Sequence, residues 1–526
     1  MFRHTLVNHF LEFSAQRFPD KVALIHQGER LTYAEIDSMA NRLAATLLDS
    51  GVKQGDRVAV FIDNSVEAVI SIFAALKAGG VFMVINHTTK AEKLAYIMNN
   101  SRAKVLLTQG GRTDVLQGIN CPYLETIIIA GHHKPFNQST SQLFNQSDLS
   151  CIAYEDVVNS GRSVTVVSKS IDLDLASIIY TSGSTGIPKG VMLSHLNMVS
   201  AAHSITTYLE NTENDIIMNV LPMSFDYGLY QILMGFKIGG TVVLEKSFTY
   251  PYQIIDTMTK EKVTGFPGVP TIFAILLRLK DIHKFNLISL RYITNTAAAL
   301  PVSHIQRLRE LFPQAKLYSM YGLTECKRVS YLPPIELDKR PSSIGKGMPN
   351  EEIFIVNENG KKVGPGEVGE LVVRGPHVMI GYWEMPEETE KCLRHGKYHG
   401  ERVLYTGDLF KMDEEGYFYF VARKDDIIKC KGEKVSPKEI ENVLYGLDGI
   451  VEAAVIGVPD EIFGQAIKAY IALEKGSTLT EKDIQRYCSQ HLENLMIPKY
   501  IEILPSLPKT MTGKISKKEL KPWLVE

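Results

Sequence analysis

Tyr-Thr-Ser-Gly-Ser-Thr-Gly-Ile-Pro-Lys-Gly-Val, residues 180–191, is the stretch that decides the fold class of this 526-residue chain. Residues 176–180, just before it, are short, apolar and rich in isoleucine, which predicts a buried strand. Glycines let backbone N–H groups turn towards an anion, hydroxyl groups add donors, and a lysine supplies a point charge for phosphate. We therefore predict a polyphosphate-binding loop at the end of a strand, formed by Thr181, Ser182, Gly183, Ser184, Thr185, Gly186 and Lys189.

This loop does not have the spacing of a Walker A motif, because Gly190 follows Lys189 where that motif has serine or threonine. Pro188 also argues against a helix that begins directly after the loop. The alternative is a flexible connection without a function. Four hydroxyl residues, three glycines and a lysine within residues 181–190 favour phosphate binding over a passive connection.

Residues 180–191 resemble the phosphate loop of the AMP-forming adenylating enzymes, which include acyl-CoA synthetases, adenylation domains of peptide synthetases and luciferases. The resemblance continues to the C-terminus and covers nearly the whole chain. It implies ATP and Mg²⁺ as cofactors and an acyl-adenylate intermediate made from a small carboxylic acid. It also implies transfer of the acyl group to a thiol, either CoA or the phosphopantetheine of an acyl or peptidyl carrier protein.

Composition indicates an ordinary globular protein of more than one domain. A net charge of −2 provides no general attraction to nucleic acid or to an anionic membrane, so we expect neither as a partner. No apolar run is long enough to span a bilayer. The six cysteines show no metal-binding spacing and are expected to be reduced thiols, which predicts a cytoplasmic protein.

Strands alternate with helical patterns over the first part of the chain, for example strand 57–62, helix 66–78 and strand 81–85. This alternation predicts an α/β fold with parallel sheets. From about residue 350, short alternating strands and turn dipeptides such as Asn359-Gly360 predict a small antiparallel β subdomain. We place a boundary near Asp425. Residues 1–424 would bind ATP and the carboxylate, and residues 425–526 would form a smaller, mobile α+β lid domain carrying the catalytic lysine.

Tyr321-Gly322-Leu323-Thr324-Glu325 follows a predicted strand. A flat aromatic ring can stack on adenine, and a carboxylate can hold Mg²⁺ beside the phosphates. A glycine turn with a solvated glutamate is the alternative. The stretch matches the second signature of the family, which implies that Tyr321 stacks on adenine, Gly322 and Thr324 belong to the ATP site, and Glu325 binds the metal.

Two further segments complete the nucleotide site that the resemblance implies. The small residues Ala297, Ala298 and Ala299 would line the adenine. Asp408 lies in a predicted tight turn, where an ionised carboxylate can accept two hydrogen bonds from a ribose diol. A turn aspartate without a function is common, but the resemblance implies that Asp408 and Arg423 hold the ribose.

The C-terminal part contributes the catalytic lysine and the hinge. Lys514, preceded by Gly513, matches the C-terminal signature of the family and would neutralise charge on the carboxylate that attacks the α-phosphorus. Composition alone favours one more solvated lysine in a basic tail. The resemblance also implies a swing about Asp425 between two half-reactions, with Lys429 near the active site in the second.

The residues expected to contact the acid are Phe225, Asp226, Phe266 and Gly268. Asp226 resembles the aspartate that pairs with the substrate ammonium in amino-acid-activating members, and a buried carboxylate is costly unless a cation meets it. It could equally cap the helix that follows.

This spelling, together with residues 431–437, leads us to expect transfer of a small amino acid to a carrier protein, as in stand-alone prolyl-activating ligases. The alternative is an acyl-CoA synthetase for a fatty or aryl acid. Two more distant alternatives are an ATP phosphotransferase and a nucleotide-binding protein without activity. The residues 326–328, Cys-Lys-Arg, receive no predicted role.

Overall fold

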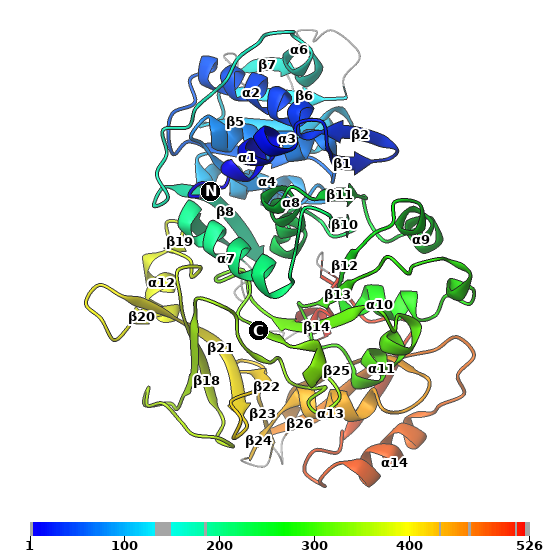
Figure 1. The fold of residues 1–526 in the computed structure, drawn as a ribbon. Helices are drawn as coiled ribbons and strands as arrows, with labels where there is room; N and C mark the ends of the chain where they lie inside the picture. The colour runs from blue at the N-terminus through cyan, green and yellow to red at the C-terminus, as the bar shows by residue number, and fades with distance from the viewer. Residues whose placement is uncertain are drawn as a thin grey trace.

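The computed structural model of the chain describes residues 4–131, 149–182, 187–430, 433–460, 464–510 and 513–520. These residues form two large sheets, a smaller antiparallel sheet and a C-terminal sheet (Figure 1). Residues 131–150, rich in Asn, Gln, Ser and His, predict an irregular surface segment, and most of them, residues 132–148, lie outside the described residues.

The first large sheet has the strand order β19-β9-β8-β4-β3-β5-β6-β7 and is parallel from β8 to β7. Its interior strands read as continuous apolar runs because helices cover both faces. Its members are β3 (Arg57–Phe61), β4 (Val81–Val84), β5 (Val105–Gln109), β6 (Thr126–Ala130), β7 (Ser150–Ala153), β8 (Leu175–Ser182), β9 (Pro188–Ser194) and β19 (Gly381–Tyr382).

The second large sheet has the order β16-β15-β14-β13-β12-β10-β11-β1-β2, with antiparallel strands only at its two ends. Its members are β1 (Val22–His26), β2 (Glu29–Thr32), β10 (Ile216–Asn219), β11 (Thr241–Leu244), β12 (Gly265–Gly268), β13 (Tyr292–Asn295), β14 (Lys316–Tyr321), β15 (Ser330–Leu332) and β16 (Lys346–Gly347).

Helices pack on and between the two large sheets. They are α1 (His9–Arg17), α2 (Tyr33–Asp49), α3 (Val66–Lys77), α4 (Ala91–Ser101), α5 (Thr113–Leu116), α6 (Tyr154–Val158), α7 (His195–Tyr208), α8 (Asp226–Ile238), α9 (Pro251–Lys260), α10 (Pro270–Leu276) and α11 (Val302–Leu311). Helix α2 begins at a capping box of Thr32 and Glu35, which the Thr-x-x-Glu spacing of the sequence predicts. Helix α8 is buried on all sides, and its Phe236 stacks on Phe73 of α3 with ring centres 5.1 Å apart. The sequence of α8 therefore shows little amphipathic pattern.

The antiparallel sheet is the predicted β subdomain. It contains β17 (Glu352–Val356), β18 (Gly369–Arg374), β20 (Leu393–His395), β21 (Arg402–Met412) and β22 (Phe418–Arg423), and α12 (Pro386–Cys392) lies beside it.

The C-terminal part has a sheet and a hydrophobic core of its own. It is built from β23 (Ile428–Cys430), β24 (Glu433–Val435), α13 (Pro437–Leu444), β25 (Ile450–Asp460), β26 (Gly464–Leu473), α14 (Glu481–His491), β27 (Tyr500–Leu504) and α15 (Lys517–Leu520). This arrangement confirms the predicted α/β fold with a smaller α+β C-terminal domain. Asp425 is exposed in the turn between β22 and β23, and the boundary placed there stays a prediction.

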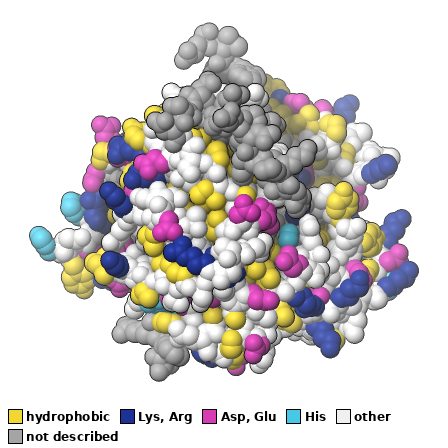
Figure 2. All heavy atoms as spheres, turned by 90° about the horizontal axis from the view of Figure 1, so that it is seen from above, with side chains coloured by type: hydrophobic (Ala, Val, Ile, Leu, Met, Phe, Trp, Pro, Cys, Tyr) yellow, Lys and Arg dark blue, Asp and Glu magenta, His cyan; other side chains and the backbone are white. Residues whose placement is uncertain are grey.

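The surface agrees with the small net charge. On the face shown in Figure 2, acidic and basic side chains are interspersed rather than gathered by sign. Among the helices that the structure describes, none combines the length and apolar character needed to cross a bilayer.

Candidate active site

Several predicted site residues lie at or just after the carboxyl ends of neighbouring parallel strands. Gly268, which ends β12, is in register with Asn295, which ends β13, and Asn295 is in register with Ser319 near the end of β14. The loops that follow these three strands therefore lie side by side, where open α/β sheets bind ligands. The first turn of α8, with Asp226, begins a few residues after the end of β10 in the same sheet.

Lys189 follows the phosphate loop and is held by a protein carboxylate. Gly183, Ser184, Thr185 and Gly186 lie outside the described residues, as does the side chain of Ser182. Thr181 pairs with Lys189 across the antiparallel strands β8 and β9. Lys189 Nζ lies 2.5 Å from Glu388 Oε2, and Lys189 and Lys391 lower the pKa of Glu388 to about 2. The predicted phosphate ligand thus has a counter-ion from α12.

The turn after β13 is strained. Ala297 has a φ of 75°, in the left-handed region that disfavours residues with a Cβ, and Ala298 and Ala299 beside it are exposed. Asn295 Oδ1 and Thr296 Oγ1 are buried without hydrogen-bond partners among the described residues. Strain and unsatisfied polar atoms in one turn are typical of a ligand-binding segment.

Tyr321, Asp408 and Arg423 form one hydrogen-bonded group. The Tyr321 hydroxyl donates to Asp408 Oδ2 over 2.6 Å, and Arg423 Nε donates to Asp408 Oδ1 over 3.1 Å. Asp408 is only 7% exposed; its burial raises its pKa, and the charge of Arg423 opposes that shift. Both carboxylate oxygens keep a free lone pair, so the group fits the ribose site that the resemblance implies.

Gly322 is required by a close approach of two backbone segments. A Cβ at this position would lie 2.0 Å from the carbonyl oxygen of Lys327. The resulting tight turn presents Glu325, whose Oε1 accepts a 2.8 Å hydrogen bond from the Tyr382 hydroxyl. Thr324 contributes its carbonyl oxygen, which accepts a 3.0 Å hydrogen bond from Lys327 Nζ.

Glu325 suits a magnesium ion that is shared with a nucleotide. The described residues contain no group of three or more His, Cys, Asp or Glu side chains placed to hold a metal. Mg²⁺ commonly takes one or two protein carboxylates, with substrate phosphates and waters filling the remaining positions. Glu325 is bonded to Tyr382, whose ring centre lies 5.2 Å from Lys189 Nζ, so a lone glutamate fits here, and its role as ligand stays a prediction.

Lys514 reaches the site from the C-terminal domain. The preceding Gly513 has a φ of 78°, and a Cβ there would lie 3.3 Å from Thr271 Oγ1 in α10, so the glycine serves both the turn and the domain contact. Lys514 remains in contact with solvent. Burial nonetheless lowers its pKa, against the opposing charges of Asp226, Asp408 and Glu325.

Asp226 does not cap α8. The N-cap residue is Phe225, which makes no capping hydrogen bond with its side chain, and Asp226 is the first helical residue. A negative charge in this first turn still suits the helix dipole. Asp226 is 5% exposed, and its carboxylate is the first among the charges that raise the pKa of both Lys327 and Lys514. The alternative of helix capping by hydrogen bonding is therefore wrong.

The other predicted acid-binding residues belong mainly to the core. Phe266 is fully buried, with its ring centre 6.0 Å from Phe248 and 6.1 Å from Phe273. A Cβ on Gly268 would lie 2.6 Å from Phe273 Cζ, so the glycine is fixed by packing. Whether these residues also contact the acid stays a prediction. The same holds for Lys429, whose backbone is in β23 and whose side chain lies outside the described part of the chain.

Four residues near the site were not singled out from the sequence. They are Lys327, Arg328, Tyr382 and Glu388. Lys327 and Arg328 are two and three positions after Glu325 in the sequence. They are only 1% and 3% exposed, and composition alone does not reveal this burial. Glu388 lies in α12, far from the loop in sequence.

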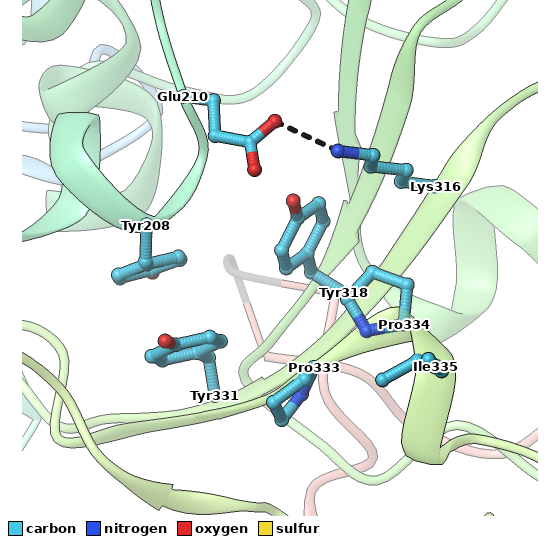
Figure 3. Close-up of a pocket in the computed structure, with 8 residues that line it drawn as sticks. All are labelled: Tyr208, Glu210, Lys316, Tyr318, Tyr331, Pro333, Pro334 and Ile335. Carbon is cyan, nitrogen blue, oxygen red and sulfur yellow. Dashed lines mark hydrogen bonds and ion pairs between the residues drawn. The ribbon is translucent and has the colours of Figure 1, made fainter.

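A separate hollow of about 290 Å³ lies away from this chemistry (Figure 3). It is lined by Tyr208, Glu210, Lys316, Tyr318, Tyr331, Pro333, Pro334 and Ile335. Lys316 begins β14, whereas Tyr321, at the other end of this strand, belongs to the active site. Its lining includes a 2.7 Å ion pair between Glu210 and Lys316 and the stacked rings of Tyr208 and Tyr331.

Comparison with known proteins assigns most of the chain to two protein-family models. Residues 11–383 match the AMP-binding enzyme family, and residues 439–514 match the AMP-binding enzyme C-terminal domain. The chain belongs to the AMP-binding enzyme family. The predicted superfamily is thereby confirmed, and the chain is an ATP-dependent, adenylate-forming acid–thiol ligase.

Relatives match this family member over almost its full length. A long-chain-fatty-acid–CoA ligase of Bacillus subtilis is 33% identical over 96% of this chain and 92% of its own. An oxalate–CoA ligase of Arabidopsis thaliana is 32% identical over 97% of this chain and 96% of its own. The crystal structure of the anthranilate CoA ligase AuaEII in complex with anthranoyl-AMP superposes with a TM-score of 0.89 at 28% identity, covering 99% of this chain and 97% of that one.

Proposed function

We propose that this enzyme is an AMP-forming CoA ligase, which activates an organic acid as its adenylate and then transfers the acyl group to CoA. The observation that supports the proposal most is that Gly513, beside Lys514, packs against Thr271 of α10, while the charges of Asp226, Asp408 and Glu325 raise the pKa of Lys514 against its burial. The relatives named above are CoA ligases, which supports the predicted alternative over transfer to a carrier protein. None of the six cysteines forms a disulfide, as expected for a cytoplasmic enzyme.

In the first half-reaction, an oxygen of the acid's carboxylate attacks the α-phosphorus of ATP, and pyrophosphate leaves. The charge of Lys514 offsets the repulsion between the two anions that approach each other. Asp408, Tyr321 and Arg423 would hold the ribose, and Lys189 with the preceding loop would hold the phosphates. Glu325 would bind Mg²⁺, which would supply additional positive charge at the phosphate oxygens.

In the second half-reaction, the thiol of CoA loses its proton, its sulfur attacks the acyl carbon, and AMP leaves. We infer that the domain of residues 425–526 turns about Asp425 between the two steps, since Asp425 is exposed in the turn between β22 and β23. The rotation would remove Lys514 from the site and bring the strand of Lys429 towards it.

The surroundings of Asp226 argue against a substrate ammonium. The reason for expecting one was that a buried carboxylate needs a cation. Lys327 and Lys514 already provide two, since Asp226 raises the pKa of both. An acid without an amino group therefore suits this site, and transfer of an amino acid to a carrier protein is the competing outcome of the test.

The test is product analysis with the purified enzyme, ATP, Mg²⁺ and a panel of fatty, aryl, dicarboxylic and amino acids. AMP, pyrophosphate and a CoA thioester are expected from at least one acid without an amino group. ADP as product would refute adenylation. Stimulation of ATP–pyrophosphate exchange by amino acids alone, with no CoA thioester formed, would refute the choice of acid and acceptor.

A further inference from the structure

Arg328 is a buried cation that has no carboxylate partner among the described residues. Its side chain is 3% exposed, and its guanidinium carbon lies 4.5 Å from the centre of the Tyr227 ring. Its hydrogen bonding to the described residues is limited to a long contact of 3.5 Å from Nη1 to the carbonyl oxygen of Lys327. Nε is buried without any acceptor among those residues. A guanidinium has five N–H donors, so most of its capacity is unused.

A second strongly buried arginine among the described residues has carboxylate partners. Arg340 is 5% exposed and forms ion pairs with Glu336, Asp413 and Glu415. Those three carboxylates compensate its desolvation, as is usual for buried charges. Arg328 has no such carboxylates among the described residues. Its guanidinium can therefore bind an anion from outside them.

Arg328 packs against the helix turn that carries Asp226. The ring beneath it belongs to Tyr227, which directly follows Asp226 in the first turn of α8. Lys327, the preceding residue, is within electrostatic range of Asp226 and Glu325, and its Nζ lies 6.0 Å from the centre of the Tyr230 ring. Arg328 is thus close to the aspartate that also faces Lys514.

The charges buried beside this helix turn do not balance. Asp226 carries one negative charge, whereas Lys327 and Arg328 carry two positive charges, and all three side chains are at most 5% exposed. None of the three forms an ion pair within the described residues at 4.0 Å or less, although Lys327 donates to a carbonyl oxygen. A further anion would balance the group, whereas a cationic ligand would add to its excess.

We propose that Arg328 binds a second carboxylate of the substrate, so that this enzyme activates a dicarboxylic acid. One carboxylate reacts with ATP beside Lys514, and the other accepts paired hydrogen bonds from the guanidinium, whose planar fork matches a carboxylate. The negative charge of Asp226 would lie between the carboxylate that reacts and the carboxylate that Arg328 binds. This inference rests on the proposed CoA ligase function, and it names the class of acid.

The experiment compares acids of equal length with one or two carboxylates, such as butanoate with succinate and hexanoate with adipate. The wild-type enzyme should give a higher kcat/KM with at least one diacid than with its monoacid partner. Arg328→Met should lower kcat/KM for that diacid by roughly 10²- to 10⁴-fold, as expected when one partner of a buried charge pair is lost. It should leave the monoacid within a few-fold, and Arg328→Lys should recover only part of the diacid activity because lysine lacks the fork.

Arg340→Met is the matched control, because it also removes a buried arginine but lies away from the acid. It should lower stability without changing the ratio of diacid to monoacid. A wild-type enzyme that prefers monoacids, or equal losses for both acids in Arg328→Met, would overturn the proposal; the wild-type comparison decides the matter even if the variant does not fold. Formation of acyl-CoA from monoacids alone would leave the CoA ligase function intact, whereas no AMP and no CoA thioester from any acid would refute that function itself.

Discussion

Replacement of Lys514 by alanine should separate the two half-reactions. Lys514 faces Asp226, Asp408 and Glu325, whose charges favour its protonated form, while burial and Arg423 oppose it. During adenylation the attacking carboxylate and the α-phosphate add further negative charge at this point. A unit charge about 4 Å away contributes roughly 4 kcal/mol at an effective dielectric constant of about 20. Groups with this role typically contribute about 2.7–4 kcal/mol, so adenylation should slow roughly 10²- to 10³-fold.

The assay measures each half-reaction by itself. ATP–pyrophosphate exchange reports adenylation, and transfer from a supplied acyl-adenylate to CoA reports the second step. Lys517→Ala is a suitable control, because Lys517 is near Lys514 in sequence but forms a 2.7 Å ion pair with Glu441 inside the C-terminal domain. Equal losses in both half-reactions of a folded Lys514→Ala enzyme, or the same loss in Lys517→Ala, would refute the assignment.

The lowered pKa of Lys514 adds a pH signature. The adenylation step needs the charged amine, and burial makes this amine lose its proton at a lower pH than a free lysine does. Exchange activity should therefore decline with rising pH before the ordinary lysine pKa of about 10.4 is reached. The transfer step, which does not use Lys514, should show no such limb.

Three further changes test other parts of the argument. Asp425→Pro fixes φ in the predicted hinge and should abolish one half-reaction while largely keeping the other; unchanged overall turnover would exclude this pivot. Asp226→Ala removes the anion that faces Lys514 and should shift the alkaline limb of the exchange profile to still lower pH, whereas a loss confined to amino acids would restore the idea of ammonium pairing. Burial lowers the pKa of Lys237 to about 8. Between that pH and the ordinary lysine pKa of about 10.4, the unfolded chain binds more protons than the folded enzyme does. The free energy of unfolding should therefore rise with pH across this window. Lys237→Met should accordingly stabilise the enzyme by about 2 kcal/mol at pH 7, once the loss of the hydrogen bond from Lys237 to Thr206 is subtracted. Denaturant unfolding of both enzymes at pH 7 and pH 10 measures this gain, which should be smaller at pH 10.

The sequence predicted the layers of the fold better than the contacts of the site. Alternating apolar runs and helix patterns were sufficient to predict the α/β sheets. The Thr-x-x-Glu spacing of Thr32 and Glu35 also marks the start of α2 in the sequence. The roles of Tyr321 and Asp408 came only from resemblance. Their hydrogen bond joins residues 87 positions apart, and no local pattern encodes such a contact.

The surroundings of Asp226 could not be predicted for the same reason. Its location before an apolar helix was clear, and its burial followed from that. The cations that face it come from the turn after β14 and from the C-terminal domain, so only the folded chain brings them together. Gly322 is a similar case, because the carbonyl oxygen of Lys327 that excludes a side chain there becomes a neighbour only when the turn closes.

The nucleotide side and the acid side of the site differ in how their cations are neutralised. Lys189 is paired with Glu388, and Arg423 with Asp408, so each cation on the nucleotide side has a carboxylate that ATP must share or displace. Glu388 is also bonded to Lys391, which can retain it when Lys189 turns to phosphate. Arg328 has no such carboxylate within the described residues. An unpaired guanidinium is costly to bury, so in our proposal the counter-ion on the acid side arrives with the substrate, and the second charge of the acid contributes to recognition as well as to binding strength.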